Sequence, residues 1–144
     1  MLRDVVSKFC VAAGLLALTA CSELGPTSPQ GNVTGGTPVV ETFSGVLPVK
    51  GAKFYSFSVE TNGTTDLTLV DAREKGVVTE ALITIGLGVP RGTSCLATNV
   101  LSVKSSGTPQ LSGVTTKGIH CAVIYDPGNL TSEATFILNI ARPR

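Results

Sequence analysis

The chain has 144 residues and a formal net charge of +1 at pH 7, with only 15% charged and 5% aromatic residues. A chain of this length is expected to form one domain. The nearly balanced charge, without clusters of Lys or Arg, excludes nucleic acid as an expected partner. It also excludes attachment to a membrane by surface charge alone.

Residues 1–20 are predicted to be a secretory signal peptide. Arg3 and Lys8 outweigh the single acid Asp4, and residues 9–20 are almost wholly apolar. About a dozen apolar residues are too few to span a bilayer core of roughly 30 Å, which needs about 20 helical residues. A basic start, a short apolar middle and small residues at the end are typical of a signal peptide. An N-terminal core helix is disfavoured because the apolar residues form no helical stripe.

The end of this segment, Leu18-Thr19-Ala20-Cys21, resembles the lipobox of bacterial lipoproteins. An ordinary signal peptidase requires a small residue at the third-last position, which Leu18 is not. The resemblance implies a diacylglyceryl thioether on the Cys21 sulfur, cleavage before Cys21 and acylation of the new amino group. Ser22 follows instead of Asp, which in a two-membrane bacterium resembles the signal for export to the outer membrane. The alternative is a soluble secreted protein with a free Cys21.

Residues 21–38 are predicted to form a flexible tether that begins at the lipidated cysteine. Three prolines and four glycines fall between Glu23 and Pro38, and such a segment cannot bury an apolar face. As a flexible chain it would have an r.m.s. span of about 22 Å, which lets the following domain clear the lipid headgroups. A disordered terminus without a role would have the same sequence.

Residues 39–144 are predicted to form an all-β domain, because short runs of β-branched and aromatic residues alternate with Gly, Pro, Asn and Ser clusters. In one run, Tyr55, Phe57 and Val59 share a face. Half-buried strands of this kind need a second sheet over their apolar faces. The expected fold is an antiparallel two-sheet β-sandwich, jelly-roll-like, with about eight strands. The expected strands are 40–47, 53–60, 66–71, 81–87, 96–103, 110–114, 119–126 and 135–141, with a charged turn or short helix at 73–76.

The four cysteines are expected to have different fates. Cys10 leaves with the signal peptide and Cys21 is lipidated, so Cys95 and Cys121 remain as an even pair in an exported chain. Disulfides persist in such compartments. A Cys95–Cys121 disulfide would stabilise the fold by roughly 3.5 kcal/mol in the chain-entropy model. A metal site is the alternative, but the chain has one His and no CxxC, so no metal is expected.

Five segments resemble strands of the bacterial pre-peptidase C-terminal domain. They are Phe43-Ser44-Gly45-Val46-Leu47, Phe54-Tyr55-Ser56-Phe57-Ser58-Val59, Leu67-Thr68-Leu69, Gly118-Ile119-His120-Cys121-Ala122-Val123-Ile124-Tyr125-Asp126 and Phe136-Ile137-Leu138-Asn139-Ile140. The resemblance implies a jelly-roll-like sandwich that is non-catalytic and linked with secretion or with binding of protein or polysaccharide. His120 departs from the family pattern, which usually has Tyr there. The family is usually appended to secreted peptidases, and this chain contains no peptidase.

His120, the only histidine, is expected to be a partly buried residue with its hydrogen bonds satisfied. Catalysis would need a positioned nucleophile and an orienting acid, and the sequence contains neither G-x-S-x-G nor HExxH. Asp66, Asp71 and Asp126 are expected at strand ends, where related collagen-binding modules can hold calcium. They lack the dense carboxylate spacing of a calcium loop, so solvated turns are expected and no cofactor is predicted.

The function predicted from these features is that of a membrane-anchored envelope lipoprotein with a non-catalytic β-sandwich module. Its lipid on Cys21 would hold it at the bacterial envelope, in the outer membrane, where the module binds protein or polysaccharide or acts structurally. Two alternatives remain open. One is an accessory or inhibitor subunit of a secreted or periplasmic enzyme, and the other is a hydrolase using His120.

Overall fold

The computed structural model describes residues 36–144, which form nine β-strands and no helix. The predicted all-β fold is therefore confirmed. The strands are β1 (Val39–Leu47), β2 (Ala52–Val59), β3 (Gly63–Glu74), β4 (Val77–Val78), β5 (Ile83–Arg91), β6 (Ser94–Val103), β7 (Leu111–Thr115), β8 (Gly118–Tyr125) and β9 (Ala134–Arg142).

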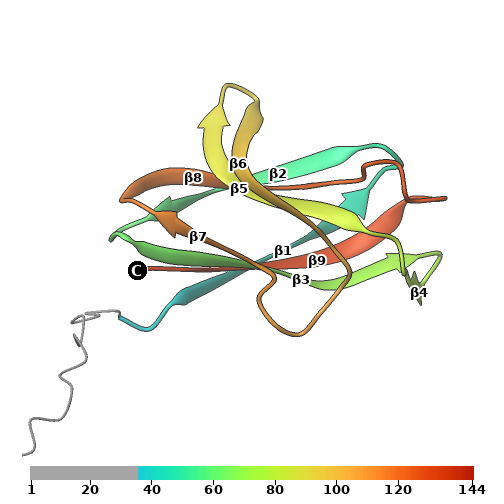
Figure 1. The fold of residues 1–144 in the computed structure, drawn as a ribbon, viewed down its shortest axis with the longest axis horizontal. Coiled ribbons are helices and arrows are strands. Elements are labelled where there is room, and N and C mark those ends of the chain that lie inside the picture. The colour runs from blue at the N-terminus through green and yellow to red at the C-terminus, as the bar shows by residue number, and fades with distance from the viewer. Residues whose placement is uncertain (1–35) are drawn as a thin grey trace, which may run out of the picture. The chain divides into compact units, whose positions relative to one another are not determined.

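The strands form two antiparallel sheets, seen as two layers in Figure 1. Sheet A has the order β1-β9-β3-β4, and β7 also pairs with β3. Sheet B has the order β2-β8-β5-β6. The first strand lies beside the last in one sheet, and the second lies beside the last but one in the other. This is the arrangement of a jelly-roll sandwich, as predicted.

The core lies between the two sheets and follows the period-two alternation of the sequence. Phe57 and Val59 are buried while the intervening Ser58 is only half-buried. Fully burying one such apolar side chain contributes about 1.5–3 kcal/mol. The large apolar side chains that are fully buried are Phe136, Leu47, Leu67, Leu69, Ile83, Ile85, Ile124, Leu138, Ile140 and Val59.

Three features of the strands differ from the prediction. β3 extends beyond 66–71 at both ends, because its first residues pair with β7 and its last residues pair with β9. The strand predicted at 81–87 is shifted to β5, which continues past Gly88 and Pro90 as a two-stranded ribbon with β6. β4 was not predicted, since two residues are too short to show a period.

The charged turn predicted at 73–76 is narrower in the structure. Arg73 and Glu74 belong to β3, and only Lys75 and Gly76 form the connection to β4. Their φ angles are +51° and +80°. Two positive φ angles are typical of the two-residue type I′ hairpin, whose twist matches that of the flanking strands.

Candidate functional site

The β5–β6 hairpin leaves the sandwich, and Figure 1 shows it rising away from the two sheets. A β-bulge between Leu87 and Gly88 shifts the register of the two strands, and such bulges bend and twist a hairpin. A Cβ atom on Gly88 would lie 2.0 Å from the carbonyl oxygen of Leu96. Only glycine therefore fits where the hairpin bends.

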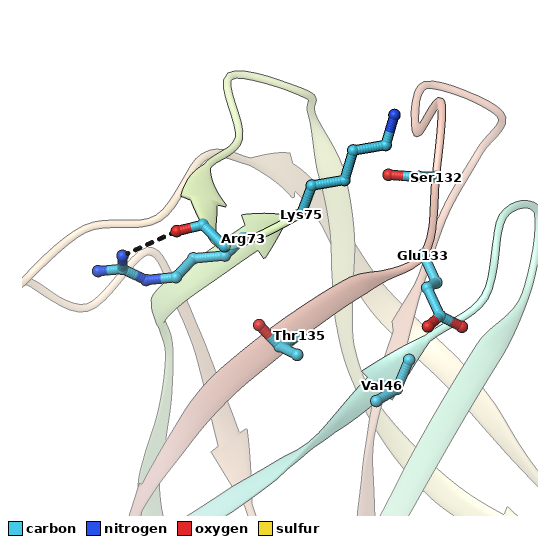
Figure 2. A pocket seen from close by; sticks show the side chains of 7 residues that line it. Val46, Arg73, Lys75, Ser132, Glu133 and Thr135 are labelled. Atoms are coloured by element: carbon cyan, nitrogen blue, oxygen red, sulfur yellow. Dashed lines mark hydrogen bonds between the residues drawn. The ribbon is translucent and has the colours of Figure 1, made fainter.

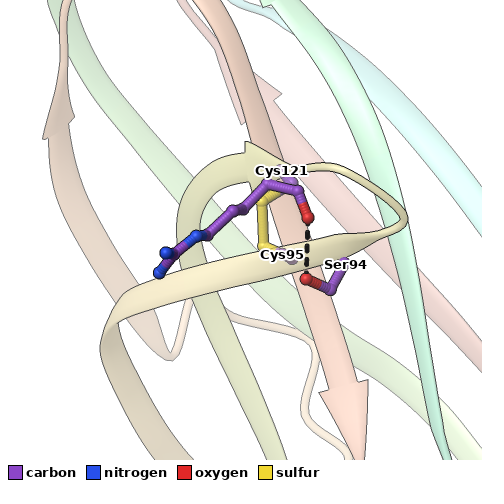
Figure 3. Close-up of a disulfide and its surroundings, with 4 residues drawn as sticks. Ser94, Cys95 and Cys121 are labelled. Atoms are coloured by element: carbon purple, nitrogen blue, oxygen red, sulfur yellow. Dashed lines mark hydrogen bonds between the residues drawn. A yellow bond between two sulfur atoms is a disulfide. The ribbon is translucent and has the colours of Figure 1, made fainter.

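The predicted disulfide between Cys95 and Cys121 is present and holds this hairpin (Figure 3). Cys95 lies on β6 and Cys121 on β8, with a Cα–Cα distance of 5.9 Å. β5 lies between these two strands in sheet B, so the disulfide crosses over it. At the tip, the Ser94 hydroxyl donates to the Arg91 carbonyl at 2.9 Å. The bent hairpin is thus fixed covalently to the sandwich.

A groove with a volume of about 300 Å³ lies between this hairpin and β7, and we call it the hairpin groove. Its lining includes the apolar Leu87 and Val114 and the polar Asn99 and His120. Asn99 bridges the two walls, because its Nδ2 donates to the Ser112 carbonyl at 3.0 Å. No Lys, Arg, Asp or Glu is among the described lining residues. Apolar walls with a few convergent polar groups suit an uncharged ligand.

His120 is half-buried and lines the hairpin groove, so the prediction of a partly buried histidine is confirmed, with a hydrogen bond at one of its two ring nitrogens. Its Nε2 lies 2.7 Å from the Thr116 carbonyl oxygen. Since a carbonyl can only accept, Nε2 carries a proton in this contact. The ring stacks on Phe57 with centroids 6.1 Å apart. The imidazole is therefore held by packing on Phe57 and by a backbone carbonyl, and its Nδ1 makes no hydrogen bond with the described residues.

The prediction of strand-end positions was wrong for Asp66 and Asp71, and the prediction of a solvated turn was wrong for Asp126. Asp66 and Asp71 lie within β3, where Asp66 accepts a hydrogen bond from the Ser112 hydroxyl at 2.5 Å and Asp71 pairs with Arg73 at 2.8 Å. Asp126 does follow a strand, but only 4% of its surface is exposed. The burial arises from pairing with chain segments far away in the sequence, which composition alone does not reveal.

Asp126 binds two loops together through backbone N–H groups. Its Oδ2 accepts from Lys50 at 2.7 Å, in the β1–β2 loop, and its Oδ1 accepts from Gly128, Asn129 and Leu130 at 2.9, 2.7 and 3.2 Å. Burial raises the pKa of this carboxyl, and the four donors together lower it further than burial raises it. The net pKa lies below its ordinary value.

A second, polar pocket of about 230 Å³ lies beside the β3–β4 turn (Figure 2). Lys75 extends along it toward the β8–β9 loop, and Glu133 lies on the opposite side near Val46. The Arg73 guanidinium is held away from the pocket by its ion pair with Asp71 and by a hydrogen bond that it donates to the Gly76 carbonyl at 3.3 Å. Charges of both signs around this pocket favour a polar ligand over an apolar one.

Next to this pocket, Glu74 fastens the β3–β4 hairpin to the β8–β9 loop, a role that sequence reasoning missed. Its Oε2 accepts from the Thr79 hydroxyl at 2.6 Å, and its Oε1 accepts from the backbone N–H groups of Thr131 and Ser132 at 2.8 and 2.9 Å. The Thr79 hydroxyl first, and then the backbone donors, lower the pKa of Glu74 to about 2.

Replacing Glu74 with Gln is expected to make the free energy of unfolding depend less steeply on pH at acid pH. The folded pKa lies below the unfolded value, so the contribution of this carboxylate is present above about pH 4.5 and is lost as the pH falls toward 2. Urea unfolding of wild type and Glu74→Gln at a series of pH values measures this difference. Glu133→Gln is the matched control, since Glu133 is an exposed carboxylate in the same loop as Thr131 and Ser132. Parallel curves for wild type and Glu74→Gln would contradict the assignment.

Between residues 36 and 144, no three His, Cys, Asp or Glu side chains gather as metal ligands. In the same range no helix is long and apolar enough to cross a membrane. The predicted signal peptide, Cys21 and the tether up to residue 35 lie outside the described residues. No protein-family model matches the chain, and no curated protein sequence matches it.

Proposed function

We propose that this chain is a lipid-anchored protein of the bacterial cell envelope whose β-sandwich is a non-catalytic binding module. The observation that carries the proposal is the run Leu18-Thr19-Ala20-Cys21, which follows a basic and then apolar segment. On this proposal, Cys21 becomes the first residue and carries the lipid. Ser22 after the cysteine supports the outer membrane as its location.

Physical chemistry supports a lipid over the other means of attachment. Without residues 1–20, nine basic and nine acidic residues remain, so the domain has no net charge to attract anionic headgroups. Each buried CH₂ contributes about 0.8 kcal/mol, and two or more acyl chains hold a protein stably where one holds it marginally. Residues 21–38 then separate the lipid from β1, which begins at Val39.

The binding role is supported by the surface of the sandwich. The hairpin groove offers apolar walls with His120 and Asn99 as polar groups, and the polar pocket offers Lys75 and Glu133. These groups suit recognition of a protein segment or a polysaccharide, which is also what the resemblance to the pre-peptidase C-terminal domain implies. Calorimetric titration against envelope polysaccharides and secreted proteins tests this role. Saturable binding to a secreted enzyme, without binding to any polysaccharide, would favour the accessory-subunit alternative.

The anchor is tested by replacing Cys21 with Ser. We expect the protein to move from the membrane fraction to the soluble fraction or to remain unprocessed, because no thioether can form. Cell fractionation and mass spectrometry of the N-terminus measure this. Cys10→Ser is the matched control, since Cys10 is removed with the leader on this proposal and its loss should leave the anchor intact. Membrane-bound wild type with an unmodified residue 21 would refute the anchor.

A further inference from the structure

The open edges of the two sheets differ in how they are protected against pairing with another strand. Sheet A ends in β1 on one side and in β4 and β7 on the other, and sheet B ends in β2 and β6. An unprotected edge presents free N–H and C=O groups to other chains, and proteins block it with short strands, bulges, lysines or covering side chains.

Four of the five edge strands carry such a device. β4 has only two residues, and β7 has five. The Asn99 side chain also occupies the Ser112 carbonyl on β7. β6 is bulged and is bent away by the disulfide at Cys95. β2 carries the exposed Lys53.

Among residues 36–144, the only such device on β1 is a long contact of 3.5 Å from the Tyr55 hydroxyl to the Ser44 carbonyl. The strand runs for nine residues in unbroken register with β9, without proline or lysine. Its one charge, Glu41, is paired with Arg142 at 2.5 Å. Val40 and Val46 stand 58% and 41% exposed on the outer face of the strand. β1 is therefore a long and partly apolar edge whose one charge is already paired within the sheet.

The hydrogen-bond alternation shows which backbone groups of β1 face the open edge of sheet A. The Gln110 N–H donates to the Leu67 carbonyl, so the peptide groups of Leu67 face away from β9. In an antiparallel ladder, neighbouring residues along a strand hydrogen-bond alternately to one side and to the other. When this alternation is followed from β3 to β9 and from β9 to β1 through the two registers, the odd-numbered residues of β1 are the ones that hydrogen-bond to β9. The even-numbered residues face the open edge. The Ser44 carbonyl agrees, since it accepts from the Tyr55 hydroxyl at 3.5 Å.

The edge-facing backbone groups of β1 are complementary to a second copy of the same strand. Two antiparallel β1 strands centred on Phe43 place Val40 opposite Val46 and Thr42 opposite Ser44, each residue facing the edge. This register makes about eight interchain hydrogen bonds in one continuous sheet. It places Glu41 opposite Gly45, so that no like charges meet. Such a contact is isologous and closes as a two-fold dimer.

We propose that β1 is a homodimerisation edge, through which two copies join their A sheets about a two-fold axis at Phe43. The cross-strand valine pairs remove part of the exposed apolar surface of Val40 and Val46 from water. The inference concerns the folded domain and does not depend on the lipid at Cys21.

Sedimentation velocity over a concentration series tests the proposal, on the purified full chain carrying Cys21→Ser so that no lipid contributes. We expect a dimer whose dissociation constant rises at least about tenfold in Val40→Lys. Ser44→Pro removes an edge-facing N–H that β9 does not use, so it should abolish the dimer while leaving the fold intact by circular dichroism.

Val77→Lys is the matched control, because Val77 is 69% exposed on β4, at the far edge of the same sheet. It should leave the dimer unchanged. A wild-type chain that stays monomeric up to about 100 μM would overturn the proposal. A dimer that survives both Val40→Lys and Ser44→Pro would overturn it equally, since it would use another surface.

Discussion

Replacing Cys95 and Cys121 with alanine is expected to lower the free energy of unfolding by about 3.5 kcal/mol in the chain-entropy model. The disulfide joins residues separated by 26 positions, and the unfolded chain gains the freedom of that loop when the bond is absent. For a domain of about 100 residues, this loss corresponds to a fall in Tm of roughly 15–25 °C. Thermal unfolding followed by circular dichroism measures it on wild type and the double variant.

The destabilisation caused by removing the disulfide should be greatest in one part of the domain. Because the disulfide crosses β5 to hold the bent hairpin, hydrogen exchange should accelerate first at the tip of the β5–β6 hairpin, next to the hairpin groove. A reductant should reproduce the loss in wild type and change nothing further in the double variant. A loss within about 0.5 kcal/mol, the range of ordinary surface substitutions, would mean that packing alone holds the hairpin.

The features predicted correctly depend only on residues that are neighbours in the sequence or on the number of residues of one type. The alternation of Tyr55, Phe57 and Val59 is a local period of two, and it identified the buried face of β2. The pairing of Cys95 with Cys121 followed from an even number of remaining cysteines. Both signals are independent of how the strands are ordered in the sheets, which is why they survive in the structure.

The features that were missed depend on residues distant in the sequence. Glu74 resembles one member of a charged turn, but its partner Thr131 is 57 residues away. The bend at Gly88 is recognisable only from the approach of the Leu96 carbonyl. Asp126 begins a typical turn sequence, and its burial arises from Lys50, 76 residues away. Only the sheet registers bring these groups together, and the sequence pattern does not specify registers.

Asp126→Ala is expected to lower the free energy of unfolding by about 3 kcal/mol, because it leaves four backbone N–H groups without their charged acceptor. Three of them belong to the loop after β8, and the fourth belongs to Lys50, whose φ of +56° is held in place by this bond. Water can reach part of this loop and replace some of the acceptors, so the loss stays below the sum of four full bonds. Urea unfolding at neutral pH measures it.

Two further variants separate the charge from the shape of this side chain. Asp126→Asn keeps one acceptor oxygen but turns an NH₂ group toward the Lys50 N–H, so we expect roughly half of the loss seen in Asp126→Ala. Because the folded pKa of Asp126 is lowered, the advantage of wild type over Asp126→Asn should disappear as the pH falls below the ordinary value of an aspartate. Asp66→Asn is the control, since the Ser112 hydroxyl is the donor to that carboxylate. Equal losses for Asp66→Asn and Asp126→Ala would mean that the four-donor loop is not what Asp126 stabilises.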